Sequence, residues 1–459
     1  MPTANSAPCH RADVLTALLC AGLFALASAV GWGMRQPNGR APLFLDWPPL
    51  YAYWDPHTGP GTVAAVALAV AIIAYGPPLA ARLSWRWLLL GSWLASMAWL
   101  WSLALVDGWR DGVAGRLTAK NEYLYAGGDQ GIHRFDDLGE ALRTYTRYIS
   151  KSTAPDNWPA HIAGHPPGAI TTFVGLDRIG LGGGAWAAVL VLTAAASAAA
   201  AVLVTLRTLG AEAAARRAAP FLVLTPWAVW AGVSADGYFA AVAAWALALL
   251  AMCAVHGSRW AGLGAGLLLG WALYLSYGLT LLVVLVAAVL WSARTLRPVP
   301  WAALGAGVVV AVFTAAGFWW WEGYRELYDR YYEGVAADRP YRYFLWANLA
   351  TVVASAGLAS MAGLRRAVVS AGRGLRSWRD TTVRGCGNPL VALTLAAALA
   401  IAAADLSGMS KAETERIWLP FTLWLLPAAA LLPPRSARWW LAAQGLVALV
   451  VNHLLVTGW

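Results

Sequence analysis

The sequence predicts an all-α protein that crosses a membrane about a dozen times and forms one transmembrane helical bundle over residues 1–459. Hydrophobic residues make up 59% of the chain and charged residues 12%, whereas soluble domains hold roughly 45–50% and about 25%. Long stretches carry no charge, and many arginines lie in the short connections between them. An uncharged run of ~20 residues crosses a hydrocarbon core of about 30 Å as a helix, which satisfies its own backbone hydrogen bonds.

The apolar runs predict about thirteen spans. The predicted spans are 14–33, 62–81, 87–106, 184–206, 218–233, 237–256, 260–275, 279–294, 300–320, 343–361, 388–405, 417–433 and 439–457. The stretch 168–180 is too short to cross and contains Asp177 and Arg178, so we expect a half-embedded or re-entrant helix there. The first run follows Arg11 but exceeds the ~7–15 residues of a signal-peptide core, so we expect it to remain as a span.

The distribution of arginine predicts the orientation of the bundle. Basic residues are enriched in cytoplasmic loops, and this rule puts the N-terminus and the basic segment 362–387 inside. The segments 34–61, 107–167 and 322–342 then lie outside, where we expect the function because long loops in compact proteins are usually functional. The formal charge of +10 is thus a topology signal. We expect a multi-pass plasma-membrane protein that contacts the lipid bilayer and binds no nucleic acid.

The chain shows no pattern typical of a metal site or of a disulfide framework. Cys9, Cys20, Cys253 and Cys386 lack metal-ligand spacing, and two of them fall inside predicted spans. No glycine-rich loop of the kind that cradles a nucleotide phosphate occurs on the inner side. We therefore expect neither a resident metal nor another cofactor.

Two carboxylates in the first outer segment are candidates for a general base. Asp46 and Asp55 lie in a stretch rich in aromatic residues and prolines, which would stiffen a loop at the membrane surface. A carboxylate held there can take a proton from a sugar hydroxyl. Each Asp can equally cap a turn beside a proline, and the residues alone leave both interpretations open.

The second outer segment offers candidate ligands for a phosphate. It contains Lys120, His161 and His165, and the last of these precedes a Pro-Pro-Gly sequence. A residue before proline is disfavoured in a helix, so we expect His165 at the start of the short helix, where free backbone amides can bind an anion. A metal site of His161, His165 and either Asp136 or Asp137 is an alternative, and so is a purely structural His-Pro turn.

Four further ionisable residues lie near the predicted outer ends of spans. Asp236 stands in a turn of small residues, and Glu415 and Arg416 stand at the mouth of the span 417–433. An ionisable group so near hydrocarbon is a functional candidate and needs a partner; for Arg416, Glu413 or a lipid phosphate would serve. Arg339 belongs to the Tyr- and Arg-rich segment 322–342, which could bind sugar rings and phosphate or form an amphipathic interfacial helix.

These features together resemble the GT-C superfamily of membrane glycosyltransferases. The resemblance rests on the first outer segment with Asp46 and Asp55, on the second outer segment that leads through His165-Pro166-Pro167-Gly168 into a short helix, and on the number of spans. The composition, rich in Ala and Arg and poor in Lys, looks like that of an actinobacterial member.

The resemblance implies a reaction and roles for the candidate residues. The donor would be a polyprenyl-phosphate-linked sugar of the mannose or arabinofuranose class, and the acceptor an envelope glycan or glycolipid on the extracytoplasmic face. The first-loop carboxylate, Asp46 or in second place Asp55, would act as base in an inverting transfer. Cationic side chains would stabilise the departing phosphate; the candidates are Lys120, His165, Arg339 and Arg416.

Two other classes of protein fit the same pattern of spans. A transporter or lipid flippase also combines many helices with ionisable groups at membrane depth. However, the stretches 189–204 and 302–316 carry no ionisable residue, and the polar groups collect on one face instead of at mid-depth. A non-catalytic scaffold would keep the fold without a role for the carboxylates.

Overall fold

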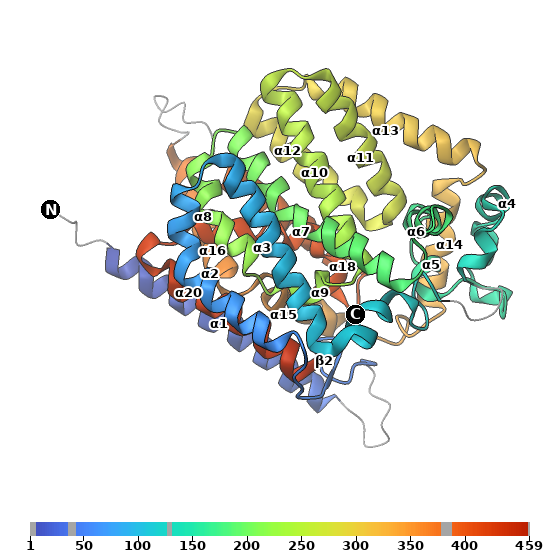
Figure 1. Ribbon diagram of the computed structural model, residues 1–459, viewed down its shortest axis with the longest axis horizontal. Helices are drawn as coiled ribbons and strands as arrows, with labels where there is room; N and C mark the ends of the chain where they lie inside the picture. The colour runs from blue at the N-terminus through green and yellow to red at the C-terminus, as the bar shows by residue number, and fades with distance from the viewer. Residues whose placement is uncertain (1–5, 35–42, 126–130, 378–387, 458–459) are drawn as a thin grey trace.

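The computed structural model describes residues 6–34, 43–125, 131–377 and 388–457. Nearly all regular structure in these residues is helical, and helices of many directions pack into one body (Figure 1). One small antiparallel sheet joins β1 (Ala52–Trp54) to β2 (Leu455–Thr457). The predicted all-α class is therefore confirmed.

Seven helices in the described part of the chain are long and apolar enough to cross a membrane. They lie in α1 (Ser6–Gly33), α2 (Thr62–Arg82), α3 (Trp85–Ala104), α7 (Gly184–Thr208), α10 (Ala235–His256), α13 (Pro298–Ala315) and α17 (Pro389–Leu406). An eighth span results if α15 (Tyr341–Ala356) and α16 (Leu358–Ser377), which meet at a bend of 111°, count as one. The chain is thus a multi-pass membrane protein.

The remaining predicted spans form helices that are shorter, interrupted or less apolar. These are α8 (Glu212–Val223), α9 (Trp227–Ala231), α11 (Arg259–Leu275), α12 (Leu282–Ala293), α19 (Leu419–Thr422) and α20 (Ala437–Leu454). The predicted span 218–233 is broken because Pro226 cannot continue α8, and the predicted span 343–361 bends at Gly357, whose φ is 80°. The total of about thirteen spans therefore stays a prediction.

Three predicted segments between the spans also contain helices. The stretch 168–180 forms α6 (Gly168–Arg178), and the segment 322–342 contains most of α14 (Trp320–Tyr332). The segment 362–387, predicted as a loop, is helical through Ser377 as most of α16, and its residues 378–387 lie outside the described residues. This correction follows from the amphipathic spacing of its arginines and apolar residues, which suits a helix as well as a loop.

The short helices of the outer segments gather at one end of the bundle. Helices α4 (Leu138–Arg143), α5 (Ala160–Ala163), α6 and α14 lie at the right of Figure 1, beyond the ends of α10 and α11. Helix α18 (Thr414–Ile417) lies between this group and the bundle. Segments that are far apart in the sequence are thereby brought together at the end of the bundle that we predict to face outward.

Helices α11 and α13 pack so closely that glycine is required at their contact. A Cβ at Gly266 would collide with the backbone of Ala302, and one at Gly270 would lie 2.9 Å from the Cα of Ala306. Small residues four apart allow such close approach in membrane bundles. This contact holds α11, whose C-terminal end borders the candidate site described below.

We expect Gly266→Val to lower the free energy of unfolding by about 1–3 kcal/mol or more, because the added side chain forces α11 away from α13. Thermal unfolding of the purified protein in detergent measures this change. Gly307→Val on α13 is the matched control, since a Cβ at Gly307 meets no atom within 4 Å. Equal stability of the two variants would contradict the close packing.

Candidate functional site

A cavity of about 890 Å³ opens at the end of the bundle where the outer segments gather. One wall is polar and comes from the segments around residues 120, 161, 236, 339 and 413. A second part of the wall is aromatic and apolar. Trp320, Tyr324, Leu327 and Tyr331 recur on one face of α14 and line it, and Ala403 and Ala404 of α17 line it as well. A cavity of this size suits a small-molecule substrate.

Arg416 is the centre of the polar wall. Its side chain is 4% exposed, and Nη1 donates to Oδ2 of Asp236 at 2.8 Å. Asp236 lies in the first turn of α10, after the N-cap Ser234, where the free amides of the helix favour a negative charge. Burial would lower the pKa of Arg416, but Asp236, Glu413 and other acidic neighbours outweigh this effect and raise it, so the guanidinium stays charged.

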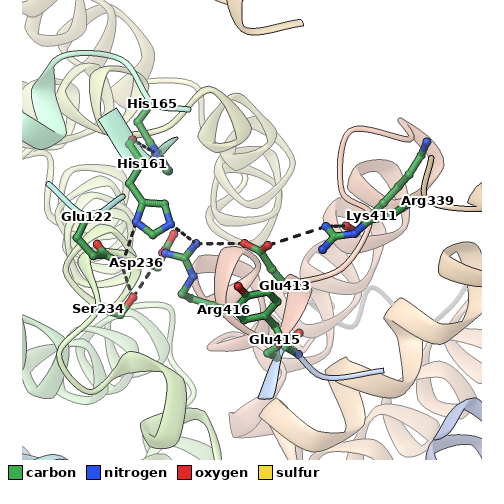
Figure 2. A network of polar contacts seen from close by, with 11 residues as sticks. Glu122, His161, His165, Ser234, Asp236, Arg339, Lys411, Glu413, Glu415 and Arg416 are labelled. Atoms are coloured by element: carbon green, nitrogen blue, oxygen red, sulfur yellow. Dashed lines mark hydrogen bonds and ion pairs between the residues drawn. The ribbon is translucent and has the colours of Figure 1, made fainter. Parts of the chain in front are cut away.

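His161 links Arg416 to a second carboxylate. Its Nδ1 lies 2.9 Å from Oε1 of Glu122, and its Nε2 lies 3.4 Å from Nη2 of Arg416 (Figure 2). If Nδ1 of His161 carries the ring proton, it donates a hydrogen bond to Glu122. Nε2 can then accept a hydrogen bond from Arg416. Burial would raise the pKa of Glu122, but the charge and hydrogen bond of His161 and the charge of Arg416 lower it. Glu122 is therefore ionised at neutral pH.

His165 lines the cavity but does not supply a positive charge. Its Nδ1 lies 2.8 Å from the carbonyl oxygen of His161, and its ring packs against Tyr123 and Phe239. Burial lowers the pKa of His165 to about 4, so its ring is neutral at pH 7. The expectation of a cation at this position is thereby corrected. The single N–H of the neutral ring donates to the carbonyl oxygen of His161, so Nε2 can only accept a hydrogen bond.

The metal alternative gains no support from the geometry. Asp137 accepts a hydrogen bond from the backbone of Glu140 and so caps α4, and the carbonyl oxygen of Asp136 accepts from Arg178. Within the described residues, no three or more His, Cys, Asp or Glu side chains are grouped so that they could hold a metal ion.

The other cations of the cavity also fasten outer segments to one another. Nε of Arg339 donates to the carbonyl oxygen of Leu43, and Nη1 donates to that of Lys411 at 2.7 Å. Nζ of Lys411 donates in turn to the carbonyl oxygen of Ala336. Lys120 is exposed and lines the cavity. Arg339 and Lys411 thus combine a structural role with a charge that faces the cavity.

Glu413 lies between Arg416 and Arg339 in Figure 2. Its carboxylate oxygens are 3.7 Å from Nη2 of Arg416 and 3.9 Å from Nη1 of Arg339, and its side chain is 28% exposed. Both Glu413 and the preceding Ala412 adopt left-handed backbone conformations, with φ of 62° and 75°. Such conformations cost about 1–3 kcal/mol each in residues other than glycine and often mark functional sites.

Glu415 holds the first outer segment against this wall without lining the cavity itself. Its side chain is fully buried, and Oε1 accepts a hydrogen bond of 2.9 Å from the backbone N–H of Tyr51. Tyr51 and Tyr53 line the cavity. Burial raises the pKa of Glu415 to about 7, so this carboxyl group is partly protonated near neutral pH.

The structure brings together most, but not all, of the predicted site residues. Lys120, His161, His165, Asp236, Arg339 and Arg416 line one cavity, and Glu415 supports it from behind. Asp46 and Asp55 are exposed and do not line it. Sequence reasoning missed Glu122 as a site residue and named Glu413 only as a partner for Arg416, a pair that the structure shows at 3.7 Å. The available signal was that each lies near a candidate, since Glu122 follows Lys120 by two positions and Glu413 precedes Arg416 by three.

Comparison with family models, with curated proteins and with solved structures found no match for this chain. The fold and the cavity define a helical multi-pass membrane protein with a charged and aromatic site at one end of the bundle. Its activity is therefore inferred from the chemistry of that site.

We expect Asp236→Ala to destabilise the protein by about 3–5 kcal/mol, because it leaves the buried guanidinium of Arg416 without its closest partner. The double variant Asp236→Ala, Arg416→Leu should recover most of this loss, since it removes the stranded charge. Thermal unfolding measures both. Glu212→Ala is a control that breaks an exposed pair with Arg207 and Arg216 and should cost far less. A double variant as unstable as Asp236→Ala would contradict this account.

Glu415 should make stability depend on pH. Its folded-state pKa of about 7 lies above the ordinary value of 4.5, so the folded state binds the proton more tightly than the unfolded state. The resulting stabilisation is complete below about pH 4.5 and is lost as the pH rises through about 7, by on the order of 3 kcal/mol. Unfolding curves of the wild type and of Glu415→Gln should therefore diverge over this range. Parallel curves would argue against a protonated Glu415.

Proposed function

We propose that the protein is a membrane glycosyltransferase that moves a sugar from a polyprenyl-phosphate carrier to a hydroxyl of an envelope glycan or glycolipid. The observation that carries this proposal is one cavity that combines cations, carboxylates and aromatic rings. The proposed donor needs a partner for its phosphate, a surface for its sugar and an apolar path for its prenyl chain. Transfer to a hydroxyl further needs a base.

The charge of the cavity supports a phosphate ligand. Four cations and three carboxylates line it among the described residues, which leaves a formal excess of positive charge. Arg416 stays charged and is held in place by Asp236. A guanidinium can bind a phosphate through two N–H groups at once. We assign the donor phosphate to Arg416, with Lys120 at the rim as a second partner.

The aromatic wall supports a sugar and a lipid. Trp320 and Tyr324 stack with their ring centroids 5.7 Å apart, and the Nε1 of Trp320 donates to the carbonyl oxygen of Leu273 on α11. Anchored indole and phenol rings offer apolar faces to a sugar ring. Leu279, Leu281 and Leu327 extend this wall with aliphatic surface, which suits the first units of a prenyl chain.

The proposed reaction is a single displacement with inversion. A carboxylate takes the proton of the acceptor hydroxyl, and the oxygen forms a bond to the anomeric carbon of the sugar. The bond from that carbon to the phosphate oxygen breaks, and its electron pair leaves with the polyprenyl phosphate. Negative charge grows on the leaving oxygen, where Arg416 can stabilise it. The chain supplies charge, position and a proton acceptor, and the donor itself carries the activated sugar.

The proposal includes the orientation of the chain. We place the N-terminus in the cytoplasm and the cavity on the extracytoplasmic face of the plasma membrane, in a bundle of twelve to thirteen spans, about the number that the apolar runs predict. Support comes from the arginine-rich connections around residues 82, 207, 294 and 365. The segments that form the polar wall are those that this rule puts outside.

A transfer assay with the purified protein in lipid nanodiscs tests this function. The donors are polyprenyl-phosphate mannose and polyprenyl-phosphate arabinofuranose, and a membrane extract supplies the acceptors. We expect release of polyprenyl phosphate and labelling of an acceptor. Arg416→Lys keeps a positive charge beside Asp236 but loses the bidentate contact with the phosphate. The KM for the donor should therefore rise by about tenfold, and kcat should fall.

Arg435→Lys serves as the control, because Arg435 is exposed and does not line the cavity. Its kinetics should match those of the wild type. A wild-type protein that turns over neither donor, but carries polyprenyl phosphate across the bilayer of a vesicle, would instead establish the transporter alternative.

A further inference from the structure

Three carboxylates line the cavity among the described residues, and two of them have short contacts with a specific partner. Asp236 is 3% exposed and receives the Arg416 guanidinium at 2.8 Å, and its backbone N–H is held by Ser234. Glu122 is 8% exposed and lies 2.9 Å from His161. Both carboxylates are thus engaged in holding the cationic part of the wall. A base needs a carboxylate that can reach a substrate hydroxyl instead.

Glu413 is the cavity carboxylate that meets this requirement. Its contacts with Arg416 and Arg339, at 3.7 and 3.9 Å, are longer than hydrogen bonds, and more than a quarter of its side chain is exposed. The left-handed backbone at Ala412 and Glu413 places this side chain between the two arginines. A strained conformation that is kept at such a position indicates a functional constraint.

We propose that Glu413 is the general base of the transfer reaction, an inference that rests on the proposed function. A carboxylate oxygen of Glu413 takes the proton from the acceptor hydroxyl while the hydroxyl oxygen bonds to the anomeric carbon. The electron pair of the breaking carbon–oxygen bond leaves with the phosphate, and the protonated Glu413 then releases its proton to water. Arg416 binds the phosphate on one side of Glu413, and Arg339 orients the acceptor on the other.

This assignment moves the base away from the first outer segment. Asp46 and Asp55 are exposed outside the cavity wall, whereas Glu413 is part of it. That segment contributes Tyr51 and Tyr53 to the cavity instead. The two assignments predict opposite outcomes for the same pair of substitutions, so one assay decides between them.

The test measures kcat and KM for the two polyprenyl-phosphate sugars with wild type, Glu413→Gln and Glu413→Asp in nanodiscs. Glu413→Gln should lower kcat by about 10²–10⁴-fold, because the amide cannot accept the proton, with little change in the KM for the donor. Glu413→Asp should recover part of the activity, since it keeps the carboxylate. Asp46→Asn and Asp55→Asn should each retain at least half of the wild-type kcat.

Glu413→Gly separates a chemical role from a structural one. Glycine adopts a φ of 62° without strain, so this variant should melt at the wild-type temperature or above it and yet have no more activity than Glu413→Gln. Glu140→Gln is the matched control, because Glu140 is exposed and its carboxylate pairs with Arg143 at the surface. It should behave as the wild type does.

Three results would overturn the inference, and they differ in what else they overturn. An active wild type with a Glu413→Gln variant within threefold of it removes Glu413 as the base and leaves the proposed function intact. A wild type that turns over neither donor removes the proposed function and this inference together. Loss of activity in Glu413→Gly together with a large fall in its melting temperature would assign Glu413 a structural role.

Discussion

The buried ion pair between Arg416 and Asp236 is the constraint on which the site depends. Two charges this deeply buried are tolerated only when each has a close partner, and here the pair joins α18 to the first turn of α10 across 180 positions of the chain. Thr414 adds a second tie, because its hydroxyl lies 2.6 Å from that of Thr351 on α15. The segment of the chain that carries Glu413 therefore has little freedom to move.

The neighbours of this pair then differ in what they can do. Glu122 is held by His161, and its pKa is lowered. Glu415 lies behind the wall, and burial raises its pKa. Glu413 sits in the cavity between two arginines, with contacts too long to be hydrogen bonds. Different surroundings give similar carboxylates different roles, and of these three Glu413 has the most exposed side chain.

The first outer segment is held by contacts that leave its carboxylates outside the cavity. β1 pairs with β2 at the C-terminal end of α20, and His57 and Arg116 both bind the carboxylate of Asp107. Glu415 fixes Tyr51 from the other side. These contacts place Tyr51 and Tyr53 in the cavity wall. They explain why the first outer segment, which resembles a catalytic loop, contributes aromatic surface here.

The sequence by itself determined the class of the protein and the end of the bundle where its charged residues meet. Long uncharged runs must become helices in a membrane, and charges must collect outside it, so His161, Asp236 and Arg416 could be singled out from their positions alone. Only the tertiary structure decided which carboxylate pairs with which cation. Ion pairing acts over a few ångströms, and this distance is set by packing between distant segments. No local pattern in the chain could therefore separate Glu413 from Asp46.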